Sequence, residues 1–147
     1  MLRGDDGLKL ALGRIPSGLY AVGAGHGGER IGMLCSFVEQ AGFEPPMISI
    51  ALGADRPLRQ VLERGELFSV NILGTEDKAL LAAFAAAREE DPFAPFELIE
   101  NGHGLPQLAG ALAWLACRPA GSVVAGDHVV YVAEVVEGCL HREVGEP

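Results

Sequence analysis

The second half of the chain places the strongest limit on its fold. Two stretches after residue 110 are rich in apolar and β-branched residues, Ala111–Arg118 around Trp114 and His128–Val136. The second contains Val129, Val130, Val132, Val135 and Val136. Strands of this kind, joined by turns rather than helices, favour a closed antiparallel sheet over a parallel one.

The first half supplies further strand-like segments. They are Ile15–Val22, which Pro16 and Gly18 interrupt, and Ile31–Glu39, Met47–Leu52 and Leu67–Leu73. The sequence Glu44-Pro45-Pro46 predicts an extended stop before the third of these, since proline pushes the preceding residue out of helical geometry. We therefore expect about six or seven strands in all.

Two helices are expected beside these strands. Leu58, Val61 and Leu62 recur at helical spacing and predict a helix over Pro57–Arg64, with Asp55 as its cap and Pro57 in the first turn. Glu76–Ala87, rich in Ala and Leu, predicts the second. The expected fold is mainly β: a β-barrel with peripheral helices.

The length of 147 residues fits one domain, residues 1–147. The only compositional break is Arg88–Pro95, whose charges and two prolines predict an exposed connection. Hydrophobic residues make up 49% of the chain and the mean hydropathy is +0.25. No apolar run approaches the roughly 20 residues that span a bilayer, and Met1–Leu10 is too charged for a signal peptide. We assign the surplus apolarity to buried strands and an oligomer interface.

The net charge of −9 argues against a nucleic-acid or acidic-membrane partner, because both need clustered Lys and Arg. A phosphorylated ligand needs only local positive charge and is not excluded. Cys35, Cys117 and Cys139 have neither disulfide nor metal spacing, which indicates free thiols in a reducing cytoplasm. His26, His103 and His141 are interpreted as loop residues, and no metal site is expected.

A glycine cluster admits two interpretations. Gly23, Gly25 and Gly28 form a G-x-G-x-x-G pattern after a strand, and Ile31, Leu34, Cys35 and Val38 follow at helical spacing, which is most of a dinucleotide-binding fingerprint. However, Asp55 lies beyond the usual spacing of about 20 residues, and the later chain lacks strand–helix alternation. The alternative, a glycine-rich hairpin turn between two barrel strands, is favoured.

Four segments in order resemble the flavin reductase-like family. The most specific is Gly32–Pro46, similar to the family's G-M-x-A-S/N stretch followed by D/E-P-P. Leu12–Tyr20 resembles its opening strand, Arg64–Leu73 its "s-G-x-F-x-V-N-x-L" segment, and Gly126-Asp127-His128 with Glu134-Val135 its "G-D-H-x-x-x-x-G-E-V" strand. The nearest variety is the reductase module fused to flavodiiron proteins, here standing alone.

This resemblance implies an FMN-binding split β-barrel of Greek-key type that forms a homodimer. It implies FMN as the flavin, with FAD as the alternative, held near the subunit interface. NAD(P)H would deliver hydride to the flavin, which passes electrons to an acceptor protein or leaves as free reduced flavin.

The resemblance also assigns site residues. The expected flavin wall is Met33, Leu34, Cys35 and Ser36, and the expected close-approach strand end is Ala51, Leu52 and Gly53. Arg56 is the expected phosphate anchor, because a guanidinium suits that anion. A hydroxyl that often follows two positions later in the family is replaced by Leu58. The alternative for these residues is an ordinary barrel strand and a solvated arginine.

His128 is the candidate for chemistry. A histidine at the flavin edge can orient the nicotinamide carboxamide or stabilise reduced flavin. The alternative is a barrel-end histidine bonded to Asp127 or to a carbonyl. Trp114 and Tyr131 are expected in the core or an interface. The expected function is an NAD(P)H-dependent flavin reductase; the alternatives are a non-enzymatic FMN electron carrier of the same fold and a small Rossmann-type dinucleotide binder.

Overall fold

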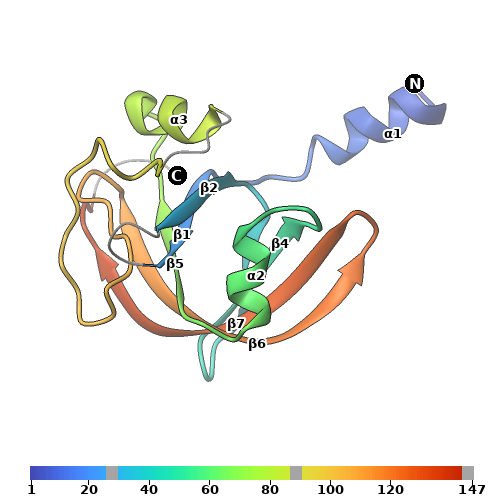
Figure 1. The fold of residues 1–147 in the computed structure, drawn as a ribbon. Coiled ribbons are helices and arrows are strands. Elements are labelled where there is room, and N and C mark those ends of the chain that lie inside the picture. Colours follow the sequence, from blue (N-terminus) through green and yellow to red (C-terminus); the bar gives the residue numbers. More distant parts are fainter. Residues whose placement is uncertain (26–29, 87–90, 144–147) are drawn as a thin grey trace.

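A single seven-stranded sheet dominates the fold (Figure 1). The structure is a computed structural model and describes residues 1–25, 30–86 and 91–143. Its strands are β1 (Tyr20–Ala24), β2 (Ile31–Cys35), β3 (Val38–Gly42), β4 (Met47–Gly53), β5 (Phe68–Ile72), β6 (Ala113–Ala125) and β7 (His128–Leu140). All neighbours pair antiparallel in the order β2-β1-β5-β6-β7-β4-β3. The expected mainly β barrel is confirmed, with β2 and β3 as the edges of its split.

The β6–β7 hairpin forms the longest part of the sheet. Its two strands pair from Ala113↔Leu140 to Ala125↔His128, and Gly126 makes the turn with φ of +63°. The strand predicted over Ala111–Arg118 therefore continues much further than expected, through Pro119. The β6–β7 pairing shifts register twice near this proline, between Ala116 and Cys117 and between Pro119 and Gly121. Irregularities of this kind let a proline sit within a strand.

The glycine cluster belongs to a hairpin. β1 pairs antiparallel with β2 from Tyr20↔Cys35 to Ala24↔Ile31, so the residues that follow the glycines form a strand rather than a helix. This excludes the Rossmann-type alternative, which requires a helix there and a parallel sheet. The hairpin interpretation is confirmed for the strands on both sides. Gly28 and the centre of the expected turn lie outside the described residues.

Helix α2 (Leu58–Glu63) lies inside the curve of the sheet (Figure 1). Its Leu58, Val61 and Leu62 are buried in the main core cluster with residues of β1, β4, β5 and β7. A six-residue helix is not stable alone, so this packing must hold it. Trp114 and Tyr131 are also buried, as expected.

The helix ends differ from those predicted. Pro57 is the N-cap of α2 and makes no side-chain cap bond, so Asp55 is not the cap. The reason is that the chain turns before the helix, where the Arg56 N–H donates to the Gly53 carbonyl at 3.0 Å. Helix α3 (Lys78–Ala85) lies within the predicted Glu76–Ala87, and Ala87 itself is not described. Helix α1 (Gly4–Leu12) was not predicted; it stands away from the sheet with no buried residue (Figure 1).

Two predicted connections are corrected by the structure. Glu44-Pro45-Pro46 is part of a tight turn between β3 and β4, with a cis Glu44–Pro45 peptide, rather than an extended stop. The segment around Pro92 is not simply exposed, because the Phe93 side chain is 0% exposed and Asp91 pairs with Arg30 at 2.7 Å. Burial of a large aromatic ring outweighs the polar composition of its neighbours. Arg88 to Glu90 lie outside the described residues.

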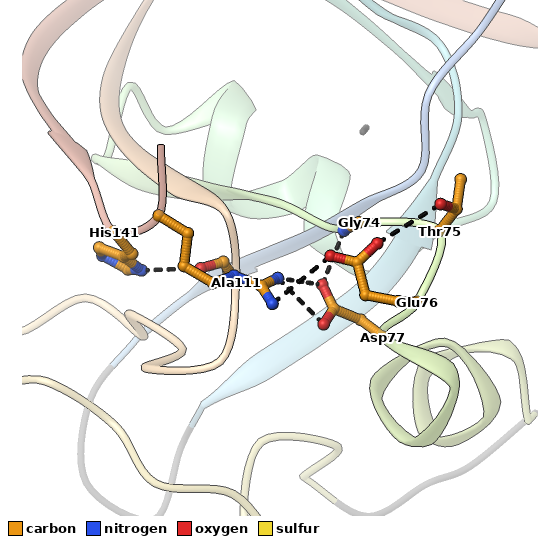
Figure 2. A network of polar contacts seen from close by, with 7 residues as sticks. Gly74, Thr75, Glu76, Asp77, Ala111 and His141 are labelled. Atoms are coloured by element: carbon orange, nitrogen blue, oxygen red, sulfur yellow. Dashed lines mark hydrogen bonds and ion pairs between the residues drawn. The ribbon is translucent and has the colours of Figure 1, made fainter. Parts of the chain in front are cut away.

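Polar contacts tie the end of β7 to the start of α3. Figure 2 shows Asp77 accepting the Gly74 N–H, at 2.7 Å, and taking part in a cluster with Glu76. Arg142 donates to both Asp77 carboxylate oxygens, at 2.8 and 3.0 Å, and lies 3.5 Å from Glu76. The neighbouring His141 Nδ1 lies 3.1 Å from the Ala111 carbonyl oxygen (Figure 2). These contacts fix His141 and Arg142, which follow β7, to Ala111 and to the start of α3.

Candidate functional site

One pocket gathers the residues that the sequence singled out. It has a volume of about 300 Å³ and lies where β2 ends, β4 ends and β7 begins. The antiparallel pairing Gly53↔His128 is what brings the last two together. Its lining residues are Met33, Leu34, Cys35, Ser36, Phe37, Ala51, Gly53, Arg56 and His128. All the predicted site residues except Leu52 are therefore neighbours around one space.

Leu52 is absent from this lining for a simple geometric reason. Successive side chains of a strand point to opposite faces. In β4 the burial alternates, with Ile48, Ile50 and Leu52 in the core and Ala51 and Gly53 on the other face. The Leu52 side chain is 0% exposed, so only its backbone is close to the pocket.

Phe37 is a lining residue that the sequence did not single out. It follows β2, is 57% exposed, and its ring centroid lies 5.6 Å from that of His128 with the planes tilted by 56°. Its carbonyl accepts a hydrogen bond from the Ala51 N–H, at 3.0 Å, which fixes the link to β4. Phe37 lies inside Ile31–Glu39, which the sequence presents as one apolar segment, so no local signal set it apart.

Arg56 lies over the end of β4. A Cβ atom at Gly53 would lie 3.2 Å from the Arg56 Cγ and 3.3 Å from an Asp55 carboxylate oxygen, so glycine lets both side chains pack close to the strand end. Arg56 is exposed and precedes α2 by two residues. Leu58, at the position where a hydroxyl was expected, is buried in the core and cannot contact a ligand here. The guanidinium is thus the cationic group of the pocket.

His128 is oriented by its neighbour. Its Nδ1 lies 2.8 Å from the Asp127 carboxylate, and this hydrogen bond lowers the pKa of Asp127. A carboxylate accepts only, so Nδ1 carries the proton and a neutral ring keeps Nε2 as an acceptor. The alternative role of His128, a bond to Asp127, is therefore present, and the same histidine also lines the pocket.

Cys35 gives the pocket an uncharged wall. Its Sγ lies 3.7 Å from the Ala51 carbonyl oxygen, and the side chain is buried. Burial raises the pKa of this thiol more than the Phe37 backbone and the Arg56 charge lower it. A neutral thiol is a weak nucleophile, so Cys35 packs rather than reacts.

A second, larger hollow of about 540 Å³ lies beside α3. Its lining includes Glu76, Asp77 and Glu97 with Lys78 as the single cation. Glu76 and Asp77 are occupied by Arg142, and the lining carries more carboxylates than cations, so size does not make this hollow the better candidate for a phosphate. Among residues 1–25, 30–86 and 91–143, no group of His, Cys, Asp and Glu is placed to hold a metal ion, and no helix is long and apolar enough to cross a membrane.

Comparison with known proteins gives one consistent result. The family described as "Flavin reductase like domain" matches residues 12–147. The reductase component of a Rhodococcus opacus 4-nitrophenol 4-monooxygenase/4-nitrocatechol 2-monooxygenase is 37% identical over 126 residues, covering 86% of this chain and 67% of that protein. Diflavin flavoprotein A 1 of Synechocystis is 33% identical over 144 residues, covering 96% of this chain. The chain spans only 25% of that second relative.

A solved structure agrees in shape as well. The NADH:FAD oxidoreductase SgcE6 of Streptomyces globisporus superposes with a TM-score of 0.83 at 26% identity. The alignment covers 95% of this chain and 86% of that one. The similarity therefore extends over nearly all of this chain.

Proposed function

The chain belongs to the flavin reductase-like domain family, whose members are flavoprotein oxidoreductases, and we propose that it binds FMN in the β2–β4–β7 pocket and reduces it with NAD(P)H. The observation that carries this proposal is the pocket itself. It is lined by the apolar strand β2, by Gly53 at the end of β4, and by the side chains of Arg56 and His128. Related proteins support the reaction class: the SgcE6 enzyme is named an NADH:FAD oxidoreductase.

The lining fits the three demands of a flavin nucleotide, which are a flat slot, donors for the ring edge and a phosphate anchor. Met33, Leu34 and Cys35 form an apolar wall of the pocket, and the small side chain of Cys35 leaves room for a flat ring. β2 is an edge strand, so alternate backbone N–H groups point away from β1 and can serve as donors. Arg56 supplies the cation, since charge-assisted bonds from a guanidinium to phosphate are strong.

His128 and Phe37 are the residues we assign to the nicotinamide side. When bound, the flavin supplies the hydride-accepting chemistry, so the protein need only orient the donor. The His128 Nε2 can accept a hydrogen bond from the carboxamide while Asp127 holds the ring in place. The Phe37 ring adds an exposed apolar surface beside it, on which a flat group can pack.

We propose FMN over FAD because the pocket offers one cation for one phosphate and lies at the small end of the range for ligand sites, which begins at about 300 Å³. FAD is the alternative, as in the name of SgcE6. The electron acceptor we propose is a flavin-using partner protein of the monooxygenase class, by analogy with the relative named as the reductase component of a monooxygenase. A diiron partner is the alternative, as implied by the resemblance to the reductase module of flavodiiron proteins.

We further propose a homodimer in a reducing cytoplasm. Several large apolar side chains are exposed: Phe37 at the pocket, Val123 and Val124 near the tip of the β6–β7 hairpin, Leu140 at the end of β7 and Phe43 in the β3–β4 turn. Exposed apolar groups of this extent mark association surfaces. A second copy would also cover the open side of the pocket. The three cysteines are free, which supports a reducing compartment.

The test is reconstitution followed by turnover. The purified protein is mixed with FMN, separated from free flavin and examined for absorbance at about 450 nm from oxidised flavin. NADH and NADPH oxidation is then measured with added FMN or FAD, and the dimer is measured by light scattering. Flavin binding without any NAD(P)H oxidation would leave an electron carrier of the same fold. A protein that takes up no flavin would contradict the proposal.

A further inference from the structure

Arg59 makes three hydrogen bonds that meet beside the pocket but not in it. Its Nη1 donates to the Ala54 carbonyl at 2.7 Å, its Nε to the Tyr131 hydroxyl at 3.0 Å and its Nη2 to Glu63 at 3.2 Å. It is not among the lining residues of the pocket. We propose that Arg59 is a positioning residue, which holds the 53–57 loop so that Arg56 faces the phosphate of the flavin. This inference rests on the proposed function.

The loop is fixed at the Ala54 peptide from two directions. The Ala54 N–H donates to the Asp127 carbonyl at 2.9 Å, and the Ala54 carbonyl accepts from Arg59 at 2.7 Å. The Asp127 bond ties the loop to the residue that precedes His128. The Arg59 bond ties it to α2. Because Arg56 lies two residues further on, the direction of its side chain depends on both ties.

Tyr131 and Glu63 fix the position of the Arg59 side chain. Tyr131 is buried in the core cluster, and its hydroxyl both accepts from Arg59 and donates to Glu63, at 2.5 Å. Glu63 and Arg59 also form an ion pair one helical turn apart. A fixed ring and a carboxylate thus set the guanidinium in one orientation. Because Glu63 balances its charge, Arg59 is poorly suited to bind an anion itself and acts through Arg56.

This role predicts an effect that depends on the phosphate. The probes are FMN and riboflavin, which share the ring and differ in the phosphate. In Arg59→Met the Kd for FMN should rise roughly tenfold, as expected for the loss of a charge-assisted contact. The Kd for riboflavin should stay within about twofold of the wild-type value, because riboflavin lacks the phosphate that Arg56 binds. In an Arg56→Ala background, Arg59→Met should produce no further rise, because the residue through which it acts is gone.

Two controls keep the outcome clear. Arg64 lies at the end of the same helix, and its guanidinium pairs with Glu66. Arg64→Met should leave the Kd values for FMN and riboflavin unchanged. Arg59→Lys keeps the charge and one donor and should recover part of the FMN affinity; it also serves as the test variant if Arg59→Met does not fold. Thermal unfolding of each variant reports on folding directly.

Equal weakening of FMN and riboflavin binding would overturn the inference and show that Arg59 only stabilises the fold. A full additional loss in the Arg56→Ala background would overturn it as well, because Arg59 would then act independently. If wild-type protein bound riboflavin and FMN equally, the phosphate role of Arg56 and this inference would fail while flavin binding stood. Failure of the wild type to bind either would overturn the proposed function itself.

Discussion

Gly23 of β1 and Gly32 of β2 are paired directly across the hairpin, and the ring of Phe93 lies over both of them. A Cβ atom built on Gly23 would lie 2.5 Å from two ring carbons of Phe93, and one on Gly32 would overlap the same ring. Phe93 packs there with Phe84 of α3, edge to face, at a centroid distance of 4.8 Å. Gly23, the first glycine of the nucleotide-like pattern, thus makes room together with Gly32 for an aromatic core residue.

Gly23→Ala should therefore destabilise the protein by about 1–3 kcal/mol, the usual cost of overpacking a filled core. Chemical denaturation measures the free energy of unfolding. The matched control is Gly102→Ala, where an added Cβ meets nothing within 4 Å. In a Gly23→Ala/Phe93→Ala double variant the two losses should be less than additive, because the ring is absent and only the contact of the new methyl with Pro106, at 2.7 Å from its Cγ, remains. Additive losses would show that the ring is not the cause.

The sequence predicted most of this architecture because its strands carry local signals. Met47–Gly53 and the β6–β7 region alternate or run β-branched, and turns punctuate them. The role of Gly23 could not be predicted, since its partner Phe93 is 70 positions away in the chain (93 minus 23) and only the folded sheet brings them together. Helix α1 was missed because Leu8, Leu10 and Leu12 recur at strand-like spacing beside two glycines, which are weak helix formers.

The sequence predicted which segments line the site, but not which side chains of those segments point toward it. Met33 to Phe37 of the motif Gly32–Pro46 and the end of β4 both line the pocket. Leu52 was included because the segment was considered as a block, whereas the two-residue period of a strand turns its side chain into the core. Phe37 was left out because nothing local distinguishes a rim residue from the end of an apolar strand. Arg59 was missed because its partner Tyr131 comes from the opposite end of the sequence.

Arg56→Ala should raise the Kd for FMN roughly tenfold or more while leaving riboflavin affinity nearly unchanged. The reason is that, among the residues that the structure describes, Arg56 is the only arginine or lysine that lines the pocket. Fluorescence titration with the two ligands measures the difference. Arg118→Ala is the matched control, because that arginine is exposed on β6 and pairs loosely with Glu134 at 3.7 Å. An FMN affinity unaffected by Arg56→Ala would place the phosphate elsewhere.

His128→Phe keeps an aromatic ring at the pocket and removes both nitrogens. We expect kcat/KM for NAD(P)H to fall about tenfold, as the donor loses its orientation, with little change in FMN affinity. Steady-state kinetics at saturating FMN gives the first value and a titration gives the second. His103→Phe, at a histidine that packs near Trp114, should leave both values as they are. If His128→Phe turned over NAD(P)H normally, the histidine would have only the structural role that its bond to Asp127 provides.

The cysteines should differ sharply in reactivity. Cys139 is exposed, whereas burial raises the pKa of Cys35 and raises that of Cys117 to about 12. A thiol reagent at pH 8 should label one cysteine in the native protein and three after denaturation, and Cys139→Ser should abolish the native labelling. Because the folded-state pKa of each buried thiol is raised, its contribution to stability is complete below the unfolded thiol value of 9.0 and is lost as the pH rises through the folded-state value, which for Cys117 is about 12. Rapid labelling of Cys117 in the folded protein would refute this account of its burial.

We propose that the β2–β4–β7 pocket binds FMN and that NAD(P)H reduces it there. The most direct measurement is an anaerobic titration of the FMN-loaded protein with NADH and then NADPH, following the flavin absorbance at about 450 nm. We predict stoichiometric bleaching by at least one of the two donors in the wild type, and slower bleaching in His128→Phe. Protein-bound FMN that keeps its full absorbance with both donors, yet is bleached by dithionite, would contradict the account.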